Sequence, residues 1–503
     1  MCIKQAEQTQ EMEFTEIQYN EMIEKLFLRF PSFQKAGASA YKPGIASMEL
    51  VDQLMGHPHR NYKIVHVAGT NGKGSVSNML ASCLASCGMK VGLYTSPHIL
   101  DFRERMRVVS ETQQNQGTYR CVSKEYVWKF MQQWHDTFDH LDLSFFEITT
   151  IMALQWFSDE GVDIVVLETG LGGRLDSTNI VKPVLSVITN IGLDHCDMLG
   201  DSLAEIAFEK AGIIKPCVPV VIGESHPETS PIFERKVLYT NLSELLFAGD
   251  RKAVMSLLTF ADKVEPPMWD EHEEILSKMD LQGAYQKKNL RTVLAALKVL
   301  SSHQVFAECE HVFDAKPWQA YSLNEGAATL FQDKCAHPLQ DAIIHTASRT
   351  GFRGRWEKLS ENPLTICDIG HNEHGLRHNF AQLEAMLSDG SCTDLIIVYG
   401  SVADKDVDAV LHLMPQNAIY IFTQAHSRRA LPAEAIREKF EKSRSGSTCS
   451  QEIYVKENVE DAVRLSQELA ASKQSQEADS RPLIYIGGST YVVSEAVAVM
   501  NNE

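Results

Sequence analysis

The chain has 503 residues, 44% of them hydrophobic and 22% charged, with a formal net charge of −19. This length predicts about two or three domains, and the composition is typical of a soluble globular protein. The negative charge argues against nucleic acid or an anionic membrane surface as the main partner, and no apolar run approaches the ~20 residues that span a membrane. Because the 11 cysteines form no CxxC pair and no secretory signal is evident, we expect a reducing cytoplasm.

In the first part of the chain, strand patterns alternate with helical ones. A polar start and a predicted helix near Ile17–Phe30 come first. The predicted strands are Tyr62–Ala68, Lys90–Tyr94, Asp163–Thr169, Val184–Asn190 and Pro219–Gly223. Their βαβ rhythm predicts a mostly parallel sheet. Beyond residue 225 the pattern loosens into charged helical stretches, and the segment 303–345 shows no motif.

A second set of strands begins at Leu364. These predicted strands are Leu364–Asp368, Asp394–Gly400, Ala418–Thr423, Ile453–Lys456 and Leu483–Gly487, with helices between them. The whole pattern predicts an α/β fold with two domains. Residues 1–350 would form a phosphate-loop domain with the mostly parallel sheet and an N-terminal helical segment, and residues 351–503 a smaller, Rossmann-like α/β domain.

The most informative stretch is Val65–Ser75. A buried strand leads into the glycine-rich Gly69–Ser75, and apolar residues at helical spacing follow as far as Cys87. In such a turn, backbone N–H groups and the positive end of the helix converge on a phosphate chain, with Lys73 on the distal phosphates. The match to G-x-x-x-x-G-K-[ST] is incomplete, because Val67 replaces the first glycine and Gly74 follows the lysine. The alternative to a phosphate-binding loop is therefore a plain glycine turn that only joins the strand to the helix.

Polar residues stand at the ends of other predicted strands. Glu168 ends one apolar strand, His195 follows another, and Ser96 lies just beyond a third. Because ligands of open α/β sheets gather at the carboxyl ends of the strands, Glu168 and His195 should face the same crevice as Lys73. A carboxylate such as Glu168 suits Mg²⁺, whereas an imidazole is a less usual ligand, and His195 could instead be a hydrogen-bonded loop residue.

Eleven short motifs occur in order along the chain. They are Gly69-Thr-Asn-Gly-Lys-Gly-Ser75, Thr95-Ser-Pro-His98, Phe146-Glu147, Glu168-Thr-Gly-Leu-Gly-Gly-Arg-Leu-Asp-Ser-Thr-Asn179, Gly192-Leu-Asp-His195, Glu209-Lys-Ala-Gly-Ile-Ile-Lys-Pro216, Gln286-Lys-Lys-Asn289, Gly354-Arg-Trp-Glu357, Asp368-Ile-Gly-His-Asn372, Asp404-Lys-Asp406 and Gly487-Gly-Ser489. Their order and spacing resemble the dihydrofolate synthase/folylpolyglutamate synthase branch of the Mur-ligase superfamily. The resemblance runs from about residue 16 to the end, although Ile369, Gly370 and Glu373 depart from the commoner residues.

The resemblance implies an ATP-dependent ligase that joins L-glutamate to a folate-type carboxylate through an acyl phosphate. The substrate would be dihydropteroate, a reduced folate or both, and the enzyme would be a monomer. The resemblance gives a catalytic set of Lys73, Glu168, His195, Lys210 and His371. It gives ATP contacts at Thr70, Asn71, Gly72, Lys73, Gly74, Ser75, Asn289, Arg355 and Asp368.

The same resemblance places two Mg²⁺ ions at Ser96, Glu168, His195 and Lys210. Lys210 would be carbamylated, which turns a cation into an oxygen donor; the alternative is an ordinary solvated lysine at a helix end. The folate-type substrate would lie against Ser144, Phe145, Phe146, Glu147, Leu175, Asp176 and Ser177. Phe145 and Phe146 could equally be core residues at the start of a helix.

Two other functions stay open at this point. A Mur-type ligase acting on a UDP-sugar peptide would share the phosphate loop and Lys210. A nucleotide-binding regulatory protein would have lost the chemistry, although the joint presence of Lys73, Glu168 and Asp368 argues against it. Since Arg355 and Asp368 lie far along the chain from Lys73, the predicted site is complete only when the two domains close.

Overall fold

The computed structural model describes residues 14–29, 44–111, 117–243, 246, 250–264, 272–301, 336–444, 452–477 and 479–502, so most of the motif-free segment 303–345 lies outside it. The elements are α1 Glu16–Arg29, α3 Ala46–Leu54, β1 Lys63–Ala68, α4 Lys73–Ser86, β2 Val91–Tyr94, β3 Met106–Glu111, β4 Gly117–Cys121, α5 Lys124–His140, α6 Phe145–Asp159, β5 Ile164–Glu168, β6 Leu185–Ile188, α7 Cys196–Leu199, α8 Leu203–Lys210, β7 Val220–Ile222, α9 Ser230–Thr240, α11 Arg251–Met255, β8 Leu258–Phe260, α12 His272–Lys278, α13 Gln286–Leu300, α15 Ala336–Ile344, α16 Thr346–Thr350, β9 Glu357–Glu361, β10 Leu364–Asp368, α17 Glu373–Ser388, β11 Asp394–Tyr399, α18 Asp408–Leu411, β12 Ile419–Thr423, α19 Ala433–Ser443, β13 Ile453–Lys456, α20 Val459–Gln476, β14 Pro482–Gly487 and α21 Thr490–Asn502.

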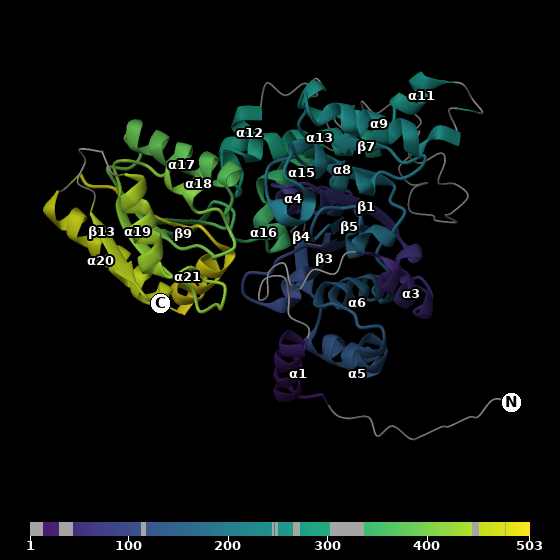
Figure 1. The fold of residues 1–503 in the computed structure, drawn as a ribbon, viewed down its shortest axis with the longest axis horizontal. Helices are drawn as coiled ribbons and strands as arrows, with labels where there is room; N and C mark the ends of the chain where they lie inside the picture. Colours follow the sequence, from purple (N-terminus) through teal and green to yellow (C-terminus); the bar gives the residue numbers. More distant parts are fainter. Residues whose placement is uncertain are drawn as a thin grey trace.

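The larger sheet has the strand order β4-β3-β2-β5-β1-β6-β7-β8. From β2 to β8 every pairing is parallel, whereas β3 and β4 add an antiparallel edge. Helices α4, α13 and α15 cover one face, and α3, α5 and α6 cover the other (Figure 1). Because both faces are covered, the central strands are buried throughout, which explains their continuous apolar sequence.

The turn from β1 into α4 has the conformation that its glycines permit. Gly72 caps the helix with φ = 84°, a left-handed backbone that residues with a Cβ rarely adopt. Helix α4 ends at Ser86, and Gly88 follows with φ = 85°. The strand–loop–helix unit is therefore confirmed.

The smaller sheet has the order β13-β12-β11-β14-β10-β9 and is parallel except for the edge strand β9. Helices α17, α18 and α19 pack on one face, and α20 and α21 on the other. Figure 1 shows the two sheets side by side, with α16 and the segment after it connecting them. The α/β fold class is confirmed. No helix in the described part of the chain has the length and apolar character that crossing a bilayer requires.

Candidate active site

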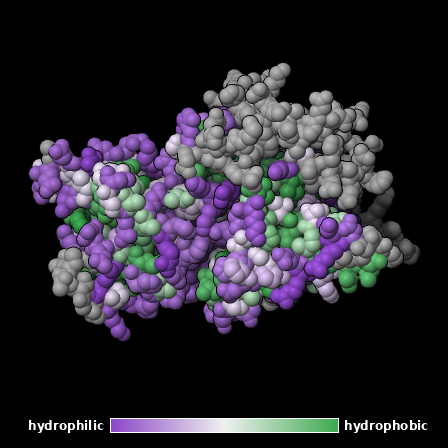
Figure 2. Space-filling view, turned by 90° about the horizontal axis from the view of Figure 1, so that it is seen from above, coloured by the Kyte–Doolittle hydropathy of each residue, from purple (hydrophilic) through white to green (hydrophobic). Residues whose placement is uncertain are grey.

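A cavity of about 260 Å³ lies between the carboxyl edge of the larger sheet and loops of the smaller one. Seen from above, the surface where the two parts meet is mostly hydrophilic (Figure 2). The structure brings most of the predicted site residues to this one cavity. They are Thr70, Asn71, Gly72, Lys73, Gly74, Ser96, Ser144, Phe145, Phe146, Glu168, Leu175, Asp176, Ser177, His195, Lys210, Arg355 and His371.

The phosphate loop is held by close contacts that leave no room for side chains at two glycines. A Cβ on Gly69 would lie 1.9 Å from the Thr189 hydroxyl oxygen, and one on Gly72 would lie 2.3 Å from Asn289 Oδ1. Within the loop, Lys73 Nζ donates to the carbonyl oxygens of Gly69 at 3.0 Å and Thr70 at 3.2 Å. The ammonium group is thus folded back over the loop, beside the space where phosphates would lie.

A second lysine converges on the same loop. Lys210, at the end of α8, is only 3% exposed, and its Nζ also donates to the Gly69 carbonyl at 3.0 Å. Burial, followed by the nearby positive charge of Lys73, lowers the pKa of Lys210 to about 7. A large share of Lys210 is therefore a neutral amine near neutral pH.

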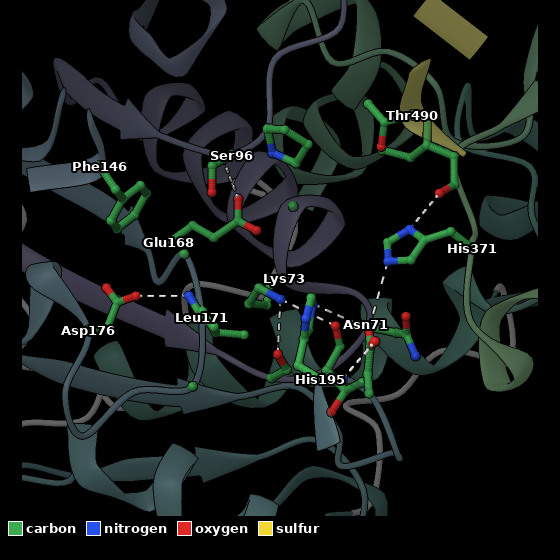
Figure 3. Close-up of a pocket in the computed structure, with 18 of the residues that line it drawn as sticks. Asn71, Lys73, Ser96, Phe146, Glu168, Leu171, Asp176, His195, His371 and Thr490 are labelled. Carbon is green, nitrogen blue, oxygen red and sulfur yellow. Dashed lines mark hydrogen bonds and ion pairs between the residues drawn. The ribbon is translucent and has the colours of Figure 1, made fainter. Parts of the chain in front are cut away.

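Glu168 and Ser96 lie next to each other beside Lys73 (Figure 3), and their side-chain oxygens could bind a cation. The Glu168 carboxylate is 2% exposed and accepts a hydrogen bond from the Ser96 backbone N–H at 3.2 Å. Burial raises the pKa of Glu168 to about 7, although Lys73 opposes the shift. A cation bound beside this carboxylate would favour its ionised form.

His195 reaches the cavity from the loop after β6. Its backbone is left-handed, with φ = 53°, and burial lowers its pKa to about 3, so the imidazole is neutral. Within the described residues, no group of three or more His, Cys, Asp or Glu side chains could hold a metal ion by itself. Mg²⁺ usually takes only one or two protein carboxylates together with phosphate oxygens and water, so the donors of Ser96 and Glu168 fit it.

A smaller cavity of about 50 Å³ adjoins the phosphate loop and is lined by Ser75, Asn289 and Asp368 among others. Asp368, at the end of β10, accepts hydrogen bonds from Tyr285 Oη at 2.6 Å, Trp356 N at 2.9 Å, Gly370 N at 2.7 Å and Asn379 Nδ2 at 2.9 Å. Its oxygens are therefore already satisfied by the protein.

Arg355 lines both cavities from the segment that connects the two sheets. Its side chain forms no hydrogen bond or ion pair with any residue that the structure describes. A guanidinium in that state can take a phosphate or stack on a base without first breaking another contact.

Asp194 joins the two halves of the site, and the sequence analysis gave it no role. Its Oδ1 lies 2.5 Å from Lys405 Nζ, and its Oδ2 accepts a hydrogen bond from Asn372 Nδ2 at 3.0 Å. Burial alone would raise the pKa of Asp194, but His371 and the ammonium group of Lys405 hold it well below its usual range. Asp194 belongs to the motif Gly192–His195 and Lys405 to the motif Asp404–Asp406. Membership of these motifs was the only sequence feature that could have indicated a role for the two residues.

The wall opposite the lysines carries the residues predicted to bind a folate-type substrate. Phe145 is both core and cavity wall: it is 2% exposed, and its ring stacks on Phe27 at 5.1 Å between centroids. The buried Arg105, which the sequence analysis missed, lies 5.3 Å from the Phe145 ring centroid and also lines the cavity.

Glu147 stands apart from the other predicted substrate residues. It forms a capping box with Ser144 at the start of α6, accepting a hydrogen bond from the Ser144 backbone N–H at 2.7 Å. Glu147 is not among the described residues that line the cavity. In this structure its side chain stabilises the helix that carries Phe145 and Phe146.

Two family models match the chain: the Mur ligase middle domain over residues 67–297, and the Mur ligase, glutamate ligase domain over residues 354–476. A dihydrofolate synthase/folylpolyglutamate synthase from Bacillus subtilis is 30% identical over 373 residues, which cover 72% of this chain and 76% of that protein. A probable bifunctional folylpolyglutamate synthase/dihydropteroate synthase from Haloferax volcanii is 29% identical over 465 residues, 90% of this chain, but the chain spans only 48% of that protein.

The fold also matches a solved structure of a bifunctional folylpolyglutamate synthase/dihydrofolate synthase from Yersinia pestis, complexed with AMPPNP and a Mn ion. The TM-score is 0.67 at 23% identity, covering 96% of this chain and 98% of that one. These findings agree with the family expected from the motifs. The chain belongs to the dihydrofolate synthase/folylpolyglutamate synthase family of the Mur ligases.

Proposed function

We propose that the protein adds L-glutamate to dihydropteroate, to a reduced folate or to both, with ATP as the energy source. The observation that carries this proposal is the single cavity in which a phosphate loop, a buried carboxylate, a partly neutral lysine and an aromatic wall meet. A nucleotide-binding regulatory protein would need the loop but not the other three groups.

The reaction follows from the chemistry of the two substrates. A carboxylate is a poor electrophile, so transfer of the γ-phosphoryl group of ATP onto it forms an acyl phosphate and releases ADP. The amine of glutamate then attacks the acyl carbon, and phosphate leaves. Catalysis of such a transfer depends mainly on positioning and on neutralising charge.

In this scheme the phosphate loop and Lys73 bind the phosphate chain. Arg355 adds a positive charge from the connecting segment, and Asn289 and Asp368 shape the nucleoside side of the loop. The carboxylate to be activated lies between Lys73 and the wall formed by Phe146 and Leu175. Closure of the second domain over this point excludes water from an intermediate that water would hydrolyse.

For the metal, we assign Ser96, Glu168 and His195, together with a carbamylated Lys210, to two Mg²⁺ ions. Bound Mg²⁺ would neutralise charge on the phosphate oxygens. The partly neutral amine of Lys210 supports the carbamate, because a free amine attacks CO₂ and loses one proton to give an anionic oxygen donor. The same proposal includes a monomeric, cytoplasmic enzyme with domains 1–350 and 351–503.

An assay of ADP release tests the function. The full-length protein is mixed with ATP, Mg²⁺ and L-glutamate, and then with dihydropteroate, tetrahydrofolate or a UDP-sugar peptide. ADP release that depends on one or both pterin compounds supports the proposal and decides between them. Release with the UDP-sugar peptide alone, or with none of the three, contradicts it.

A further inference from the structure

A histidine lies in the middle of the central strand β1, within the otherwise apolar run Ile64–Ala68. His66 is fully buried in β1 and lies in register with Leu167 of β5 and Ser186 of β6. By strand alternation its side chain shares the face of Ile64, which packs toward α6. Burying a polar ring at this position is unfavourable unless it forms hydrogen bonds.

Among the described residues the ring has one hydrogen-bond partner, and that partner leads to the cavity. His66 Nε2 lies 2.8 Å from the hydroxyl oxygen of Thr178, and this hydroxyl donates to Asp176 Oδ1 at 2.5 Å. Asp176 is 4% exposed and lines the wall of the substrate cavity. His66, Thr178 and Asp176 therefore form a chain of hydrogen bonds from the sheet interior to the site.

The direction of this chain depends on whether Asp176 is ionised. If it is, the Thr178 hydroxyl gives its one proton to the carboxylate, and its oxygen accepts from His66 Nε2–H. The opposite tautomer would place a lone pair of Nε2 against a lone pair of Thr178. With the proton on Nε2, His66 Nδ1 is a bare acceptor, and it has no hydrogen-bond partner among the described residues.

A neutral Asp176 would reverse the chain: it would donate to the Thr178 oxygen, and the Thr178 hydroxyl would donate to His66 Nε2. The ring proton of His66 would then lie on Nδ1, as a buried N–H without an acceptor. A buried donor without a partner is rarer and more unfavourable than a buried acceptor without one, so this direction is disfavoured. The chain thus favours an ionised Asp176 whose carboxylate is fixed in place. The Leu171 backbone N–H donates to the other oxygen, Asp176 Oδ2, at 2.8 Å.

We propose that His66 is a positioning residue that acts through Thr178 to hold Asp176 as an oriented hydrogen-bond acceptor for the nitrogen-rich ring of the substrate. This inference rests on the proposed function, because it assigns Asp176 to the substrate wall. His66 itself touches neither substrate nor nucleotide.

The test compares variants that remove the donor with variants that keep it. His66→Phe fills the space without an N–H, whereas His66→Gln keeps an N–H near the position of Nε2. Thr178→Val removes the connecting hydroxyl, and Thr178→Ser keeps it. Dihydropteroate is the probe, and its affinity without ATP is measured by quenching of protein fluorescence, together with KM for dihydropteroate and for ATP.

We expect His66→Phe and Thr178→Val to weaken dihydropteroate binding and raise its KM on the order of tenfold, because Asp176 loses its fixed orientation and its charged hydrogen bond to the substrate is weakened. His66→Gln and Thr178→Ser should stay within about threefold of the wild type. KM for ATP should not change in any of the four. The double variant should lose no more affinity for dihydropteroate than Thr178→Val alone, because both substitutions break the same chain of hydrogen bonds.

Three results would overturn the inference. These are normal dihydropteroate binding in His66→Phe, an equal loss toward ATP and dihydropteroate, and additive effects in the double variant. If His66→Phe does not fold, Thr178→Val and Thr178→Ser still decide, since Thr178 lies outside the sheet. A wild-type protein that binds no pterin compound would instead refute the proposed function.

Discussion

Lys210 is the residue whose chemistry depends most on its surroundings. If a carbamate forms there, Lys210→Ala should be nearly inactive, because a metal loses its ligand, and acetate should restore part of the activity by supplying carboxylate oxygens. The exposed Lys182, changed to alanine, serves as the control and should behave as the wild type. Intact mass under gentle conditions should show one added CO₂ in the wild type and none in Lys210→Ala. An active, ligand-bound enzyme with an unmodified Lys210 contradicts this assignment.

His66 also makes stability depend on pH. Burial lowers the pKa of His66 from 6.5 to about 3. Between these values only the unfolded chain takes up the proton, so the stability from the neutral ring is complete above pH 6.5 and is lost as the pH falls toward 3. The loss is about 1.4 kcal/mol per pH unit for one proton.

Urea unfolding at pH 7, 6 and 5 measures this effect. The free energy of unfolding should fall more steeply for the wild type than for His66→Gln, which has no group to protonate. The exposed His135, changed to glutamine, controls for the general effect of acid and should follow the wild type. Parallel curves for the wild type and His66→Gln would show that protonation of His66 is not coupled to unfolding.

At the scale of elements, the phosphate loop depends on the glycine that caps α4. Gly72→Ala would place a Cβ 2.3 Å from Asn289 Oδ1 in a left-handed backbone, whereas Gly161, also left-handed, has nothing within 4 Å of its Cβ position. Both variants should lose about 1–2 kcal/mol of stability through backbone strain. Only Gly72→Ala should also raise KM for ATP, because the collision moves the loop. Equal KM values for ATP would contradict the role given to the Gly72–Asn289 contact.

The elements that the sequence predicted well are those with a local signal. The parallel strands are short Val- and Ile-rich runs, and α4 carries a glycine at each end. The strands β3, β4 and β9, which pair antiparallel, and the short parallel strand β8, Leu258–Phe260, were missed. Strand β9, Glu357–Glu361, is too polar to be recognised and becomes a strand because it pairs with β10. Strand β3 carries Arg107, which is buried and donates to the Thr350 carbonyl at 2.7 Å, a partner far along the chain.

In the whole molecule, the contacts between the two sheets are what the sequence alone could not predict. Residues at the strand ends of one sheet could be predicted because parallel strands bring them to a common edge. The contact between Asp194 and Lys405 joins residues 211 positions apart and depends on how the two halves are placed. No local sequence pattern contains that information. The motifs that include Asp194 and Lys405 could therefore be recognised, but the contact between the two residues could not be predicted.

The pair Asp194–Lys405 should stabilise the closed arrangement of the two halves. Its side chains are 9% and 14% exposed, so removing one partner leaves a largely buried charge, at about 1–3 kcal/mol once partial exposure is allowed for. Asp194→Asn and Lys405→Met should each enlarge the radius of gyration of the ligand-free protein, measured by small-angle X-ray scattering, and lower kcat. The double variant should be less affected than the sum of the two, since each single change leaves the other charge unpaired.

The matched control for this pair is an exposed one. Arg437 pairs with Glu434 and Glu441 on the surface of α19, where such contacts contribute little, so Arg437→Ala should change neither the radius of gyration nor kcat. If Asp194→Asn has the same radius as the wild type and full activity, the ion pair does not hold the halves together. Closure would then depend on the neutral hydrogen bonds alone, such as the one that Asn372 Nδ2 donates to Asn71 Oδ1 at 3.0 Å.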